Sequence, residues 1–309
     1  MNGILSGKRI LLFNPPGRLF QRGEDRCKGN IEDSTATVPR TPIDLCYMAA
    51  VARRFGAQCR IRDFPAEAGT WEDFELELKA AGADVLIMSV TNATVLEDLR
   101  AFRIARRRRS DVLCIAKGAL FFNPAPDLLR RPELDCVDYA IGGESDTVLR
   151  DLIPAHFLDR DPSRVAGLSC RAKNGTWRTA GFGIFEDALD GIPFPARELI
   201  RNELYIRPDT GEPQTTVVTG RGCPYACTFC LTPTISGKQA RQRSSGNICD
   251  ELQECVERHG IRNFFLRADT FTLDEDWVLA LCREIGRRGL KIAWVANSRV
   301  APIVLQETF

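Results

Sequence analysis

Strand and helix signals alternate through the first 157 residues of this 309-residue chain, and this alternation restricts its fold more than any other feature. Five short apolar runs lie at residues 9–13, 59–64, 84–90, 112–116 and 137–141. Most are rich in β-branched or large apolar residues, as buried parallel strands are. Helical patterns follow the second, third and fifth runs, at about 72–81, 95–109 and 144–157. Because parallel strands need crossover connections, residues 1–157 are predicted to form a doubly wound, Rossmann-like α/β domain.

A further helix is predicted between the first two strands. Thr41 is suited to be its N-cap, with Pro42 in its first turn. The helical pattern continues through Arg53, and Gly56 is expected to end it. The polar segment before this helix, residues 17–40, has the length of a lid or a disordered loop.

The residues that follow the predicted strands are small or polar. They are Asn14 and Pro15 after the first strand, Thr91 and Asn92 after the third, Gly118 after the fourth, and Gly142, Gly143 and Glu144 after the fifth. In a doubly wound sheet, ligands bind beyond the carboxyl ends of the strands. We therefore expect a ligand site at this edge; the alternative is that these are only the turn residues that every α/β domain needs.

The second half of the chain begins with a predicted linker over residues 158–214. Within it, Asn174-Gly175 lies between two short strand patterns and predicts a tight hairpin. A second βα series follows over residues 215–309. Its strands are predicted at 215–219, 263–268 and 291–295, and its helices at about 246–259 and 274–288. This order is typical of the first half of a (β/α) barrel.

Charge and hydropathy exclude several classes of protein. Lys and Arg number 42 against 41 Asp and Glu, and the resulting net charge of +1 gives no nucleic-acid footprint. The first residues have the pattern of a strand rather than a signal peptide, and no stretch is long and apolar enough to span a membrane. We therefore expect a cytoplasmic, reducing compartment, where the 12 cysteines are thiols or metal ligands rather than disulfides.

Three of the cysteines form a cluster in the segment RGCPYACTFC, whereas the other nine are scattered. Cys223, Cys227 and Cys230 directly follow a predicted strand. A structural zinc site needs a fourth ligand, for which Cys249 and His259 are the nearest candidates. A redox CxxC pair would leave Cys223 without a role. A cubane iron–sulfur cluster fits better, because three thiolates hold three irons and leave the fourth open for catalysis.

This cysteine spacing, with Phe229 directly before the last cysteine, resembles the signature of the radical S-adenosylmethionine (SAM) superfamily. Further matching segments are Gly222-Cys223-Pro224, Thr232-Pro233, Gly237, Arg243-Ser244, 264–272 and 294–299. The N-terminal region resembles the cobalamin-binding domain of one branch of that superfamily. The branch includes the anaerobic magnesium-protoporphyrin cyclase and cobalamin-dependent methylases. The resemblance covers nearly the whole chain.

The resemblance implies a set of cofactors and the residues that hold them. Cys223, Cys227 and Cys230 would ligate a [4Fe-4S] cluster, and SAM would chelate its open iron. Phe229 would lie near the adenine, and Asp269 stands where the family's Gly-Gly-Glu contacts the SAM amino group. Asn297 and Arg299 would reach the methionyl carboxylate or the ribose. Cobalamin would lie against the eight residues named above, from Asn14 and Pro15 through Thr91, Asn92 and Gly118 to Gly142, Gly143 and Glu144.

The implied activity is that of a radical SAM enzyme. One electron, from a donor such as flavodoxin or ferredoxin, would cleave SAM reductively. The radical so formed would act at an unactivated carbon of a small-molecule substrate, which the enzyme would methylate, cyclise or rearrange. The cofactors carry this chemistry, and the protein supplies position and exclusion of water.

Two departures from the family pattern leave alternatives open. Many cobalamin domains place a His below the cobalt in Asp-x-His-x-x-Gly, but neither His156 nor His259 lies in such a motif. The domain would then bind cobalamin without that ligand, or have lost cobalamin. The family also closes its barrel with about six βα units, whereas three strands are visible here. We therefore expect a truncated sequence; the alternative function is a non-catalytic or fragmentary cobalamin and Fe–S binding protein.

Overall fold

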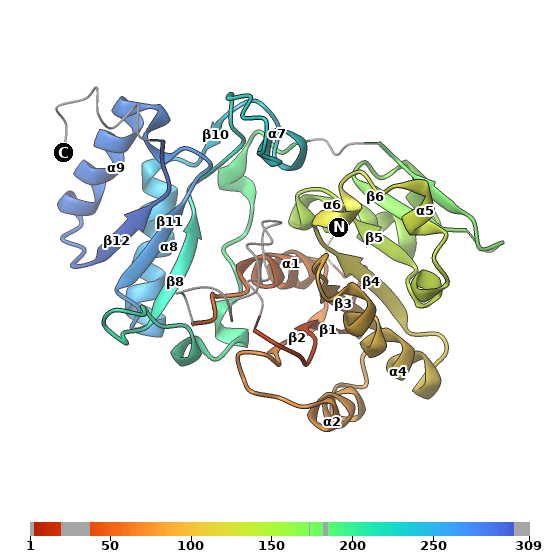
Figure 1. The fold of residues 1–309 in the computed structure, drawn as a ribbon. Coiled ribbons are helices and arrows are strands. Elements are labelled where there is room, and N and C mark those ends of the chain that lie inside the picture. Colours follow the sequence, from red (N-terminus) through yellow and green to blue (C-terminus); the bar gives the residue numbers. More distant parts are fainter. Residues whose placement is uncertain (1–2, 20–37, 173, 182–184, 300–309) are drawn as a thin grey trace. The chain divides into compact units, whose positions relative to one another are not determined.

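The structure is a computed structural model that describes residues 3–19, 38–172, 174–181 and 185–299. It divides into two units (Figure 1). The N-terminal unit contains Met1–Phe185 and Pro195–Arg201, and the C-terminal unit contains Glu186–Phe194 and Asn202–Phe309. Most of the polar segment 17–40 and the C-terminal segment 301–309 lie outside the described residues.

The N-terminal unit is built on a seven-stranded sheet with the order β2-β1-β3-β4-β5-β6-β7. Its first five strands are parallel, which confirms the predicted doubly wound fold. Their bounds are β1 Arg9–Asn14, β2 Gln58–Asp63, β3 Val85–Ser89, β4 Leu113–Lys117 and β5 Tyr139–Ile141. The carboxyl ends of these strands therefore share one edge of the sheet, as a ligand site there requires.

Helices cover both faces of this sheet (Figure 1). They are α1 Ile43–Arg54, α2 Trp71–Ala81, α3 Val95–Asp98, α4 Arg100–Arg108, α5 Pro126–Leu129 and α6 Ser145–Phe157. One core contains α1 and α6, with buried residues such as Leu45 and Leu149. The other contains α2 and α4, where Phe13 lies 5.1 Å from Phe74 and 6.3 Å from Phe102 between ring centroids. Two separate apolar cores on opposite faces explain why the inner strands β1 and β3 are buried along almost their whole length.

The start of α1 differs from its prediction. Pro42, not Thr41, occupies the N-cap position, and no side chain caps the helix. Because Pro lacks an N–H, one of the unsatisfied donors of the first turn is removed instead of being capped. The predicted helix at 95–109 is also divided, into α3 and α4 on either side of Leu99.

The hairpin around Asn174-Gly175 has the predicted tight turn but lies in a different place from the prediction. β6 (Leu168–Arg171) pairs antiparallel with β5, and β7 (Trp177–Thr179) pairs antiparallel with β6. The two strands therefore extend the N-terminal sheet, although the sequence assigns them to a linker. The sequence signals of a hairpin specify its turn, but they do not specify which other strand the hairpin pairs with, because that pairing is a tertiary contact.

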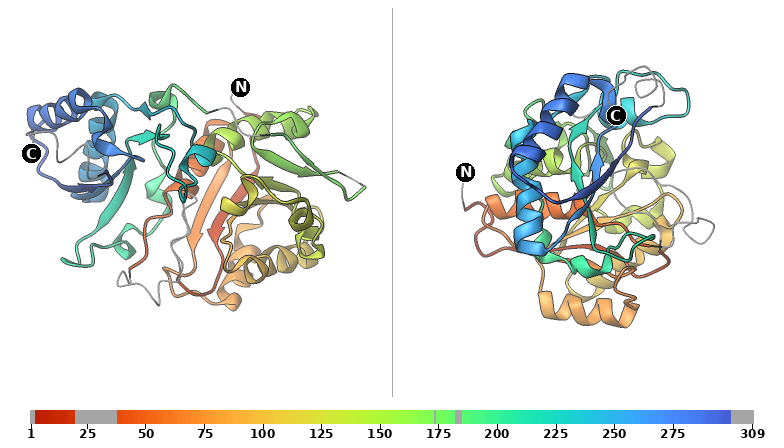
Figure 2. Two further views of the ribbon diagram at one scale, coloured as in Figure 1. Left: turned by 45° about the horizontal axis from the view of Figure 1, so that its top comes forward. Right: turned by 90° about the vertical axis from the view of Figure 1, so that its left-hand side faces the viewer.

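The C-terminal unit has the predicted βα series. β8 (Gln214–Val218), β11 (Asn263–Arg267) and β12 (Ala293–Ala296) form a parallel sheet in the order β12-β11-β8. α8 (Ser245–His259) and α9 (Glu275–Arg287) pack on the sheet through a common core (Figure 2). The remaining elements of this unit are β9 Gly220–Arg221, β10 Arg241–Gln242 and α7 Thr232–Ile235. Short 3₁₀ turns connect the elements of both units: η2 Ala119–Phe121, η3 Pro132–Cys136, η4 Pro162–Arg164, η5 Leu189–Gly191, η6 Arg197–Leu199, η7 Asn202–Leu204 and η8 Phe271–Leu273.

Buried Arg243 fixes the end of β8 against α8. Its Nη1 donates to the Val218 carbonyl at 2.8 Å and forms an ion pair with Glu251 at 2.5 Å. Its Nε donates to Asn247 Oδ1 at 2.7 Å. The Ser244 hydroxyl accepts the Asn247 N–H at the start of α8, and Gly260, with φ +67°, ends the helix. These contacts hold the strand that leads into the cysteine segment.

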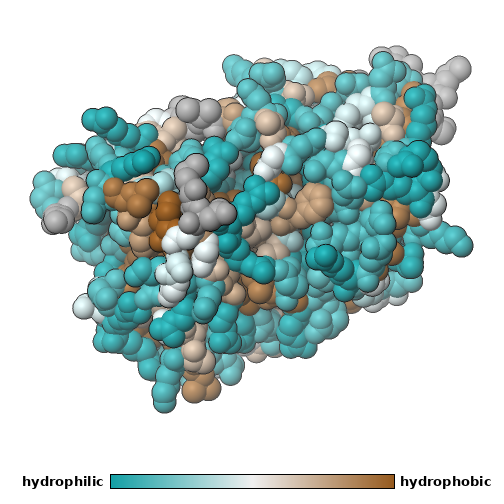
Figure 3. All heavy atoms as spheres, turned by 180° about the vertical axis from the view of Figure 1, so that it is seen from behind, coloured by the Kyte–Doolittle hydropathy of each residue, from teal (hydrophilic) through white to brown (hydrophobic). Residues whose placement is uncertain are grey.

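Among the described residues, no helix is long and apolar enough to cross a membrane. On the face shown in Figure 3, most side chains are hydrophilic, with smaller hydrophobic patches between them.

Candidate metal centre and cofactor edges

The three clustered cysteines lie in a loop at the carboxyl edge of the C-terminal sheet. We call residues 219–231 the Cys loop; it follows β8 and precedes α7. Because the three strands are parallel, the segments that follow β11 and β12 begin at the same edge of the sheet as the Cys loop. Asp269 belongs to the first of these segments, and Asn297 and Arg299 belong to the second. The fold therefore gathers the residues that the sequence singles out in this half of the chain.

Gly222 allows the Cys loop to turn tightly before Cys223. Its φ is +85°, in the left-handed region that favours glycine. A Cβ at this position would lie 2.0 Å from the Gln239 carbonyl oxygen and 2.9 Å from that of Ser236. The Cys223 N–H then donates to the Gly237 carbonyl at 3.1 Å. The first thiol is thus held by a backbone cradle that only glycine can fill.

Exposure increases along the three thiols. Cys223 is 9% exposed, Cys227 is half-buried, and Cys230 is exposed. The Cys230 N–H donates to the Cys227 carbonyl at 3.1 Å, which closes a tight turn between these two residues. The neighbouring side chain of Phe229 is 89% exposed and so does not pack on the protein. The first thiol is therefore buried, whereas the last thiol and the aromatic ring that precedes it in the sequence are exposed.

Two of the sulfur atoms have hydrogen-bonding neighbours. Cys223 Sγ lies 3.6 Å from Thr270 Oγ1, and both residues are buried. The Thr232 N–H donates to Cys230 Sγ at 3.5 Å, and Thr232 Oγ1 lies 3.3 Å from the same sulfur. Hydrogen bonds to ligand sulfurs are among the features that tune iron–sulfur clusters.

Asp269 faces the Cys loop with both carboxylate oxygens. Its Oδ2 accepts the Gly222 N–H at 2.8 Å, and its Oδ1 accepts the Thr232 hydroxyl at 3.4 Å. These contacts join the residue before the first cysteine to a residue after the last one. The prediction that Asp269 contacts the SAM amino group remains open.

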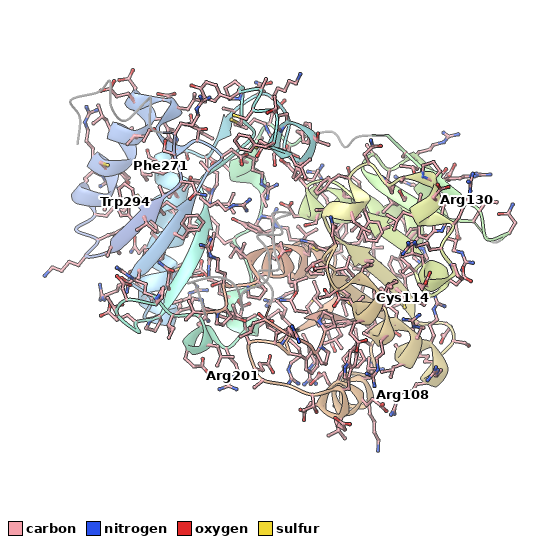
Figure 4. The ribbon with its side chains drawn as sticks, viewed as in Figure 1. Arg108, Cys114, Arg130, Arg201, Phe271 and Trp294 are labelled. Atoms are coloured by element: carbon pink, nitrogen blue, oxygen red, sulfur yellow. The ribbon has the colours of Figure 1, made fainter. Side chains whose placement is uncertain are left out.

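The segment after β12 packs on the segment after β11 and reaches the Cys loop. The Phe271 N–H donates to the Asn297 carbonyl at 2.9 Å, and the Ser298 hydroxyl contacts that of Thr272. Phe271 also lies 5.4 Å from Trp294 between ring centroids (Figure 4). These contacts fix the backbone on which Arg299 is carried.

Arg299 lies against an aromatic residue that the sequence did not single out. Its guanidinium lies 3.6 Å from the ring centroid of Tyr225, between the first two cysteines. A guanidinium over an aromatic face is held by cation–π attraction while its N–H groups still point outward in their plane. One sequence signal could have predicted this contact: Tyr225, like Phe229, is an aromatic residue within the cysteine motif, but only Phe229 was predicted to be part of the site.

The residues of the Cys loop fit an iron–sulfur cluster better than a zinc ion. Three thiols share one loop, and hydrogen-bonding groups contact the sulfurs of Cys223 and Cys230. Among the described residues, no group of three or more His, Cys, Asp or Glu side chains is already arranged as a set of metal ligands. Cys249 is fully buried in the core beneath α8, and burial raises its pKa to about 11. His259 is the last residue of α8, about 21 Å along the helix from its start. Neither zinc candidate is therefore placed to be a fourth ligand.

The carboxyl edge of the N-terminal sheet carries buried polar groups. Asn14 Nδ2 donates to Asp63 Oδ1 at 3.1 Å, while Asn14 Oδ1 has no hydrogen-bond partner within the described residues. Lys117, at the end of β4, forms a buried ion pair with Asp44 in the first turn of α1. Asp44 Oδ1 likewise has no partner in the described part of the chain. Buried acceptors of this kind indicate a place where a ligand or further residues donate hydrogen bonds.

Thr91 and Asn92 differ in how they are used at this edge. The Thr91 N–H donates to Asp98 Oδ2 at 3.3 Å, and its hydroxyl lies 2.9 Å from that of Thr94, which in turn donates to Asp98. These contacts hold the loop between β3 and α3. Asn92 is exposed, and its prediction as a ligand contact stays a prediction.

The glycines at this edge permit close backbone packing. A Cβ on Gly118 would lie 2.5 Å from the Val90 carbonyl oxygen, and one on Gly142 would lie 1.7 Å from that of Phe121. A Cβ on Gly143 would lie 3.0 Å from the Val148 side chain, and Glu144 is the N-cap residue of α6. These positions therefore serve the packing of the domain itself, and their predicted role in binding a ligand stays a prediction.

Comparison with known proteins agrees with this fold and motif. Residues 217–307 match the family model of the radical SAM superfamily. The chain is 29% identical to the uncharacterized methyltransferase PH0819 of Pyrococcus horikoshii over 84% of its own length and 55% of the relative's. It is 25% identical to the anaerobic magnesium-protoporphyrin IX monomethyl ester cyclase of Rubrivivax gelatinosus over 72% of this chain and 40% of that protein.

A solved structure shows the same fold over most of the chain. The radical SAM methyltransferase TsrM of Kitasatospora setae, solved with tryptophan and a SAM analogue, matches with a TM-score of 0.66 at 20% identity, over 91% of this chain and 51% of that one. The chain thus spans about half the length of the Pyrococcus relative and of TsrM. By the cysteine motif and the family match, residues 217–307 belong to the radical SAM superfamily, and the chain as a whole is similar to the branch that carries a cobalamin-binding-type domain ahead of the radical SAM region.

Proposed function

We propose that the chain acts as a radical SAM enzyme that, together with cobalamin, methylates an unactivated carbon of a small molecule. The observation that carries this proposal is the Cys loop: three thiols with 3-then-2 spacing, held at the carboxyl edge of β8 within the region that matches the superfamily. Methyl transfer is favoured over cyclisation or rearrangement because the Pyrococcus relative, at 29% identity, is described as a methyltransferase.

The cluster side of the proposed site rests on three ligands and a cradle. Cys223, Cys227 and Cys230 would hold a [4Fe-4S] cluster, which supplies the electron that cleaves SAM once a donor such as flavodoxin or ferredoxin has reduced it. Gly222 brings the backbone close enough to present the first thiol. The hydrogen bonds from Gly222 and Thr232 to Asp269 keep both ends of the loop in place.

The SAM side of the proposed site uses groups that the protein leaves accessible. The exposed ring of Phe229 offers an apolar face for the adenine. Arg299, stacked on Tyr225, presents N–H donors suited to a carboxylate, so it would orient the methionyl end of SAM. Asn297 would contribute its side chain to the carboxylate or the ribose, and a carboxylate oxygen of Asp269 would accept a hydrogen bond from the amino group.

The cobalamin side of the proposed site is the carboxyl edge of the N-terminal sheet. Asn14, Pro15, Thr91, Asn92, Gly118, Gly142, Gly143 and Glu144 follow the strands at that edge. The buried acceptors Asn14 Oδ1 and Asp44 Oδ1 would receive donors from the amide-rich periphery of the corrin ring. Small residues and bare backbone allow a large planar ligand to approach closely.

The cleavage of SAM tests the proposal. The protein is purified without oxygen, supplied with iron and sulfide, and incubated with SAM and dithionite while 5′-deoxyadenosine is measured by mass spectrometry. We expect iron-dependent SAM cleavage that disappears when Cys223, Cys227 and Cys230 are replaced by Ala. A cluster-loaded protein that leaves SAM intact would contradict the enzymatic proposal and favour a non-catalytic binding protein.

Retention of hydroxocobalamin tests the N-terminal site separately. Asn92→Ala, at the proposed edge, is expected to lower the fraction of cobalamin retained on gel filtration. Gln58→Ala removes an equally exposed amide at the opposite end of β2 and should leave retention unchanged. Equal retention by both variants would place cobalamin elsewhere.

A further inference from the structure

The segment that follows β11 carries two residues that contact the Cys loop from one side. Thr270 contacts the sulfur of the first cysteine, and Asp269 contacts the backbone just before it. Thr232, which Asp269 also contacts, donates its N–H to the sulfur of the last cysteine. The ligands of the proposed cluster are thus connected to β11 through hydrogen bonds at both ends of the loop.

Thr270 is the more informative of the two sulfur neighbours. Its hydroxyl lies 3.6 Å from Cys223 Sγ, Thr270 is 5% exposed, and Cys223 is 9% exposed. A metal-bound cysteine is a thiolate and has no proton to donate, so the hydroxyl must be the donor in the loaded protein. Because the contact is shielded from water, such a hydrogen bond is electrostatically stronger than it would be at the surface.

We propose that the Thr270 hydroxyl raises the reduction potential of the cluster by donating a hydrogen bond to the Cys223 thiolate, with the Thr232 N–H doing the same for Cys230. This inference rests on the proposed function, since it presupposes the cluster. Reduction adds an electron that is shared with the ligand sulfurs, so a donor to sulfur stabilises the reduced state more than the oxidised state. Thr270 is therefore a tuning residue that makes the cluster easier for its electron donor to reduce.

The role assigned to Asp269 follows from the same contacts. Its carboxylate accepts the Thr232 hydroxyl and the Gly222 N–H, and so it holds the peptide whose N–H points at Cys230 Sγ. Asp269 is a positioning residue in this arrangement and acts on the cluster through Thr232. The sequence alone does not predict the contact between Asp269 and Thr232, because Thr232 lies 37 residues before Asp269.

The experiment compares isosteric variants of two buried threonines. Thr270→Val removes the hydroxyl that faces the sulfur. Thr272→Val removes an equally buried hydroxyl, two residues along, that contacts Ser298 instead. Both proteins and the wild type are loaded with iron and sulfide without oxygen, and the midpoint potential of each cluster is measured by an EPR-monitored redox titration in the absence of SAM.

The midpoint potential of Thr270→Val is expected to be more negative than that of the wild type. At a fixed donor potential, the ratio of reduced to oxidised cluster should fall by about tenfold, which corresponds to about 59 mV for a one-electron couple. Thr272→Val should match the wild type, and Thr270→Ser, which keeps a hydroxyl, should restore most of the difference.

The outcomes separate failure of this inference from failure of the proposed function. A wild-type chain that holds no iron–sulfur cluster overturns both. A wild-type cluster whose potential is unchanged in Thr270→Val overturns the tuning role alone. Loss of the cluster in Thr270→Val, while Thr270→Ser and Thr272→Val retain it at the wild-type potential, would also overturn it, because Thr270 would then only support the loop.

Discussion

Replacing Glu251 by Gln should loosen the strand that leads into the Cys loop. Glu251 is fully buried and pairs with Arg243, whose side chain is 5% exposed and also donates to the Val218 carbonyl at the end of β8. The substitution keeps the shape of the side chain but leaves the Arg243 charge buried without its counter-charge. Removing one partner of a buried ion pair costs about 3–5 kcal/mol, and we take about 3 kcal/mol because Gln still accepts a hydrogen bond.

Hydrogen–deuterium exchange measures this loss where it occurs. If β8 and α8 exchange by local opening, a cost of about 3 kcal/mol should speed the exchange of their protected amides by roughly 10²-fold. Glu254→Gln, in an exposed pair with Arg258, is the matched control, and its cost should stay below about 1 kcal/mol. Exchange in residues 214–218 and 245–259 that stays within about threefold of wild type in Glu251→Gln would refute the reasoning.

Three further predictions concern the C-terminal unit. Gly222→Ala should lower the iron bound per chain after reconstitution, because its Cβ would overlap a backbone carbonyl; Gly246→Ala, whose Cβ meets open space, should not. Hydrogen bonds from Arg287 and Arg288 lower the pKa of Glu284 to about 2, so the NMR signal of its carboxyl should titrate near pH 2. The contribution of these bonds to folding stability should be complete above the ordinary pKa of Glu and should be lost as the pH falls through about 2. A titration near pH 4.5 would contradict this prediction. In the folded apoprotein at pH 8, iodoacetamide should alkylate exposed Cys282 and spare Cys249, whose pKa is raised to about 11 by burial; equal labelling would contradict the assigned core.

The sequence predicts the elements of both units well because hydrophobic runs and turn residues act locally. The five parallel strands and the hairpin turn at Asn174-Gly175 are found within a few residues of their predicted bounds. The pairing of β6 with β5 was not predicted, since nothing in the sequence of a hairpin specifies which sheet the hairpin joins. The N-cap of α1 was also wrong by one residue, a common uncertainty at helix ends.

The candidate site was predictable in its ligands but not in its internal contacts. The 3-then-2 spacing identifies Cys223, Cys227 and Cys230 as a set before any coordinates are known. The stacking of Arg299 on Tyr225 and the contacts of Asp269 with the Cys loop join residues more than 40 positions apart. Such contacts depend on which strands end side by side, so they become visible only when β8, β11 and β12 are placed in one sheet.

The response of the cluster's EPR spectrum to SAM tests the central claim most directly: three thiolates hold a cluster whose fourth iron is open. We expect the reduced, reconstituted protein to show an iron–sulfur signal that changes when SAM is added. A variant with Cys223, Cys227 and Cys230 replaced by Ala should show no signal. A wild-type signal that SAM leaves unchanged, or one that persists in the triple variant, would contradict the account.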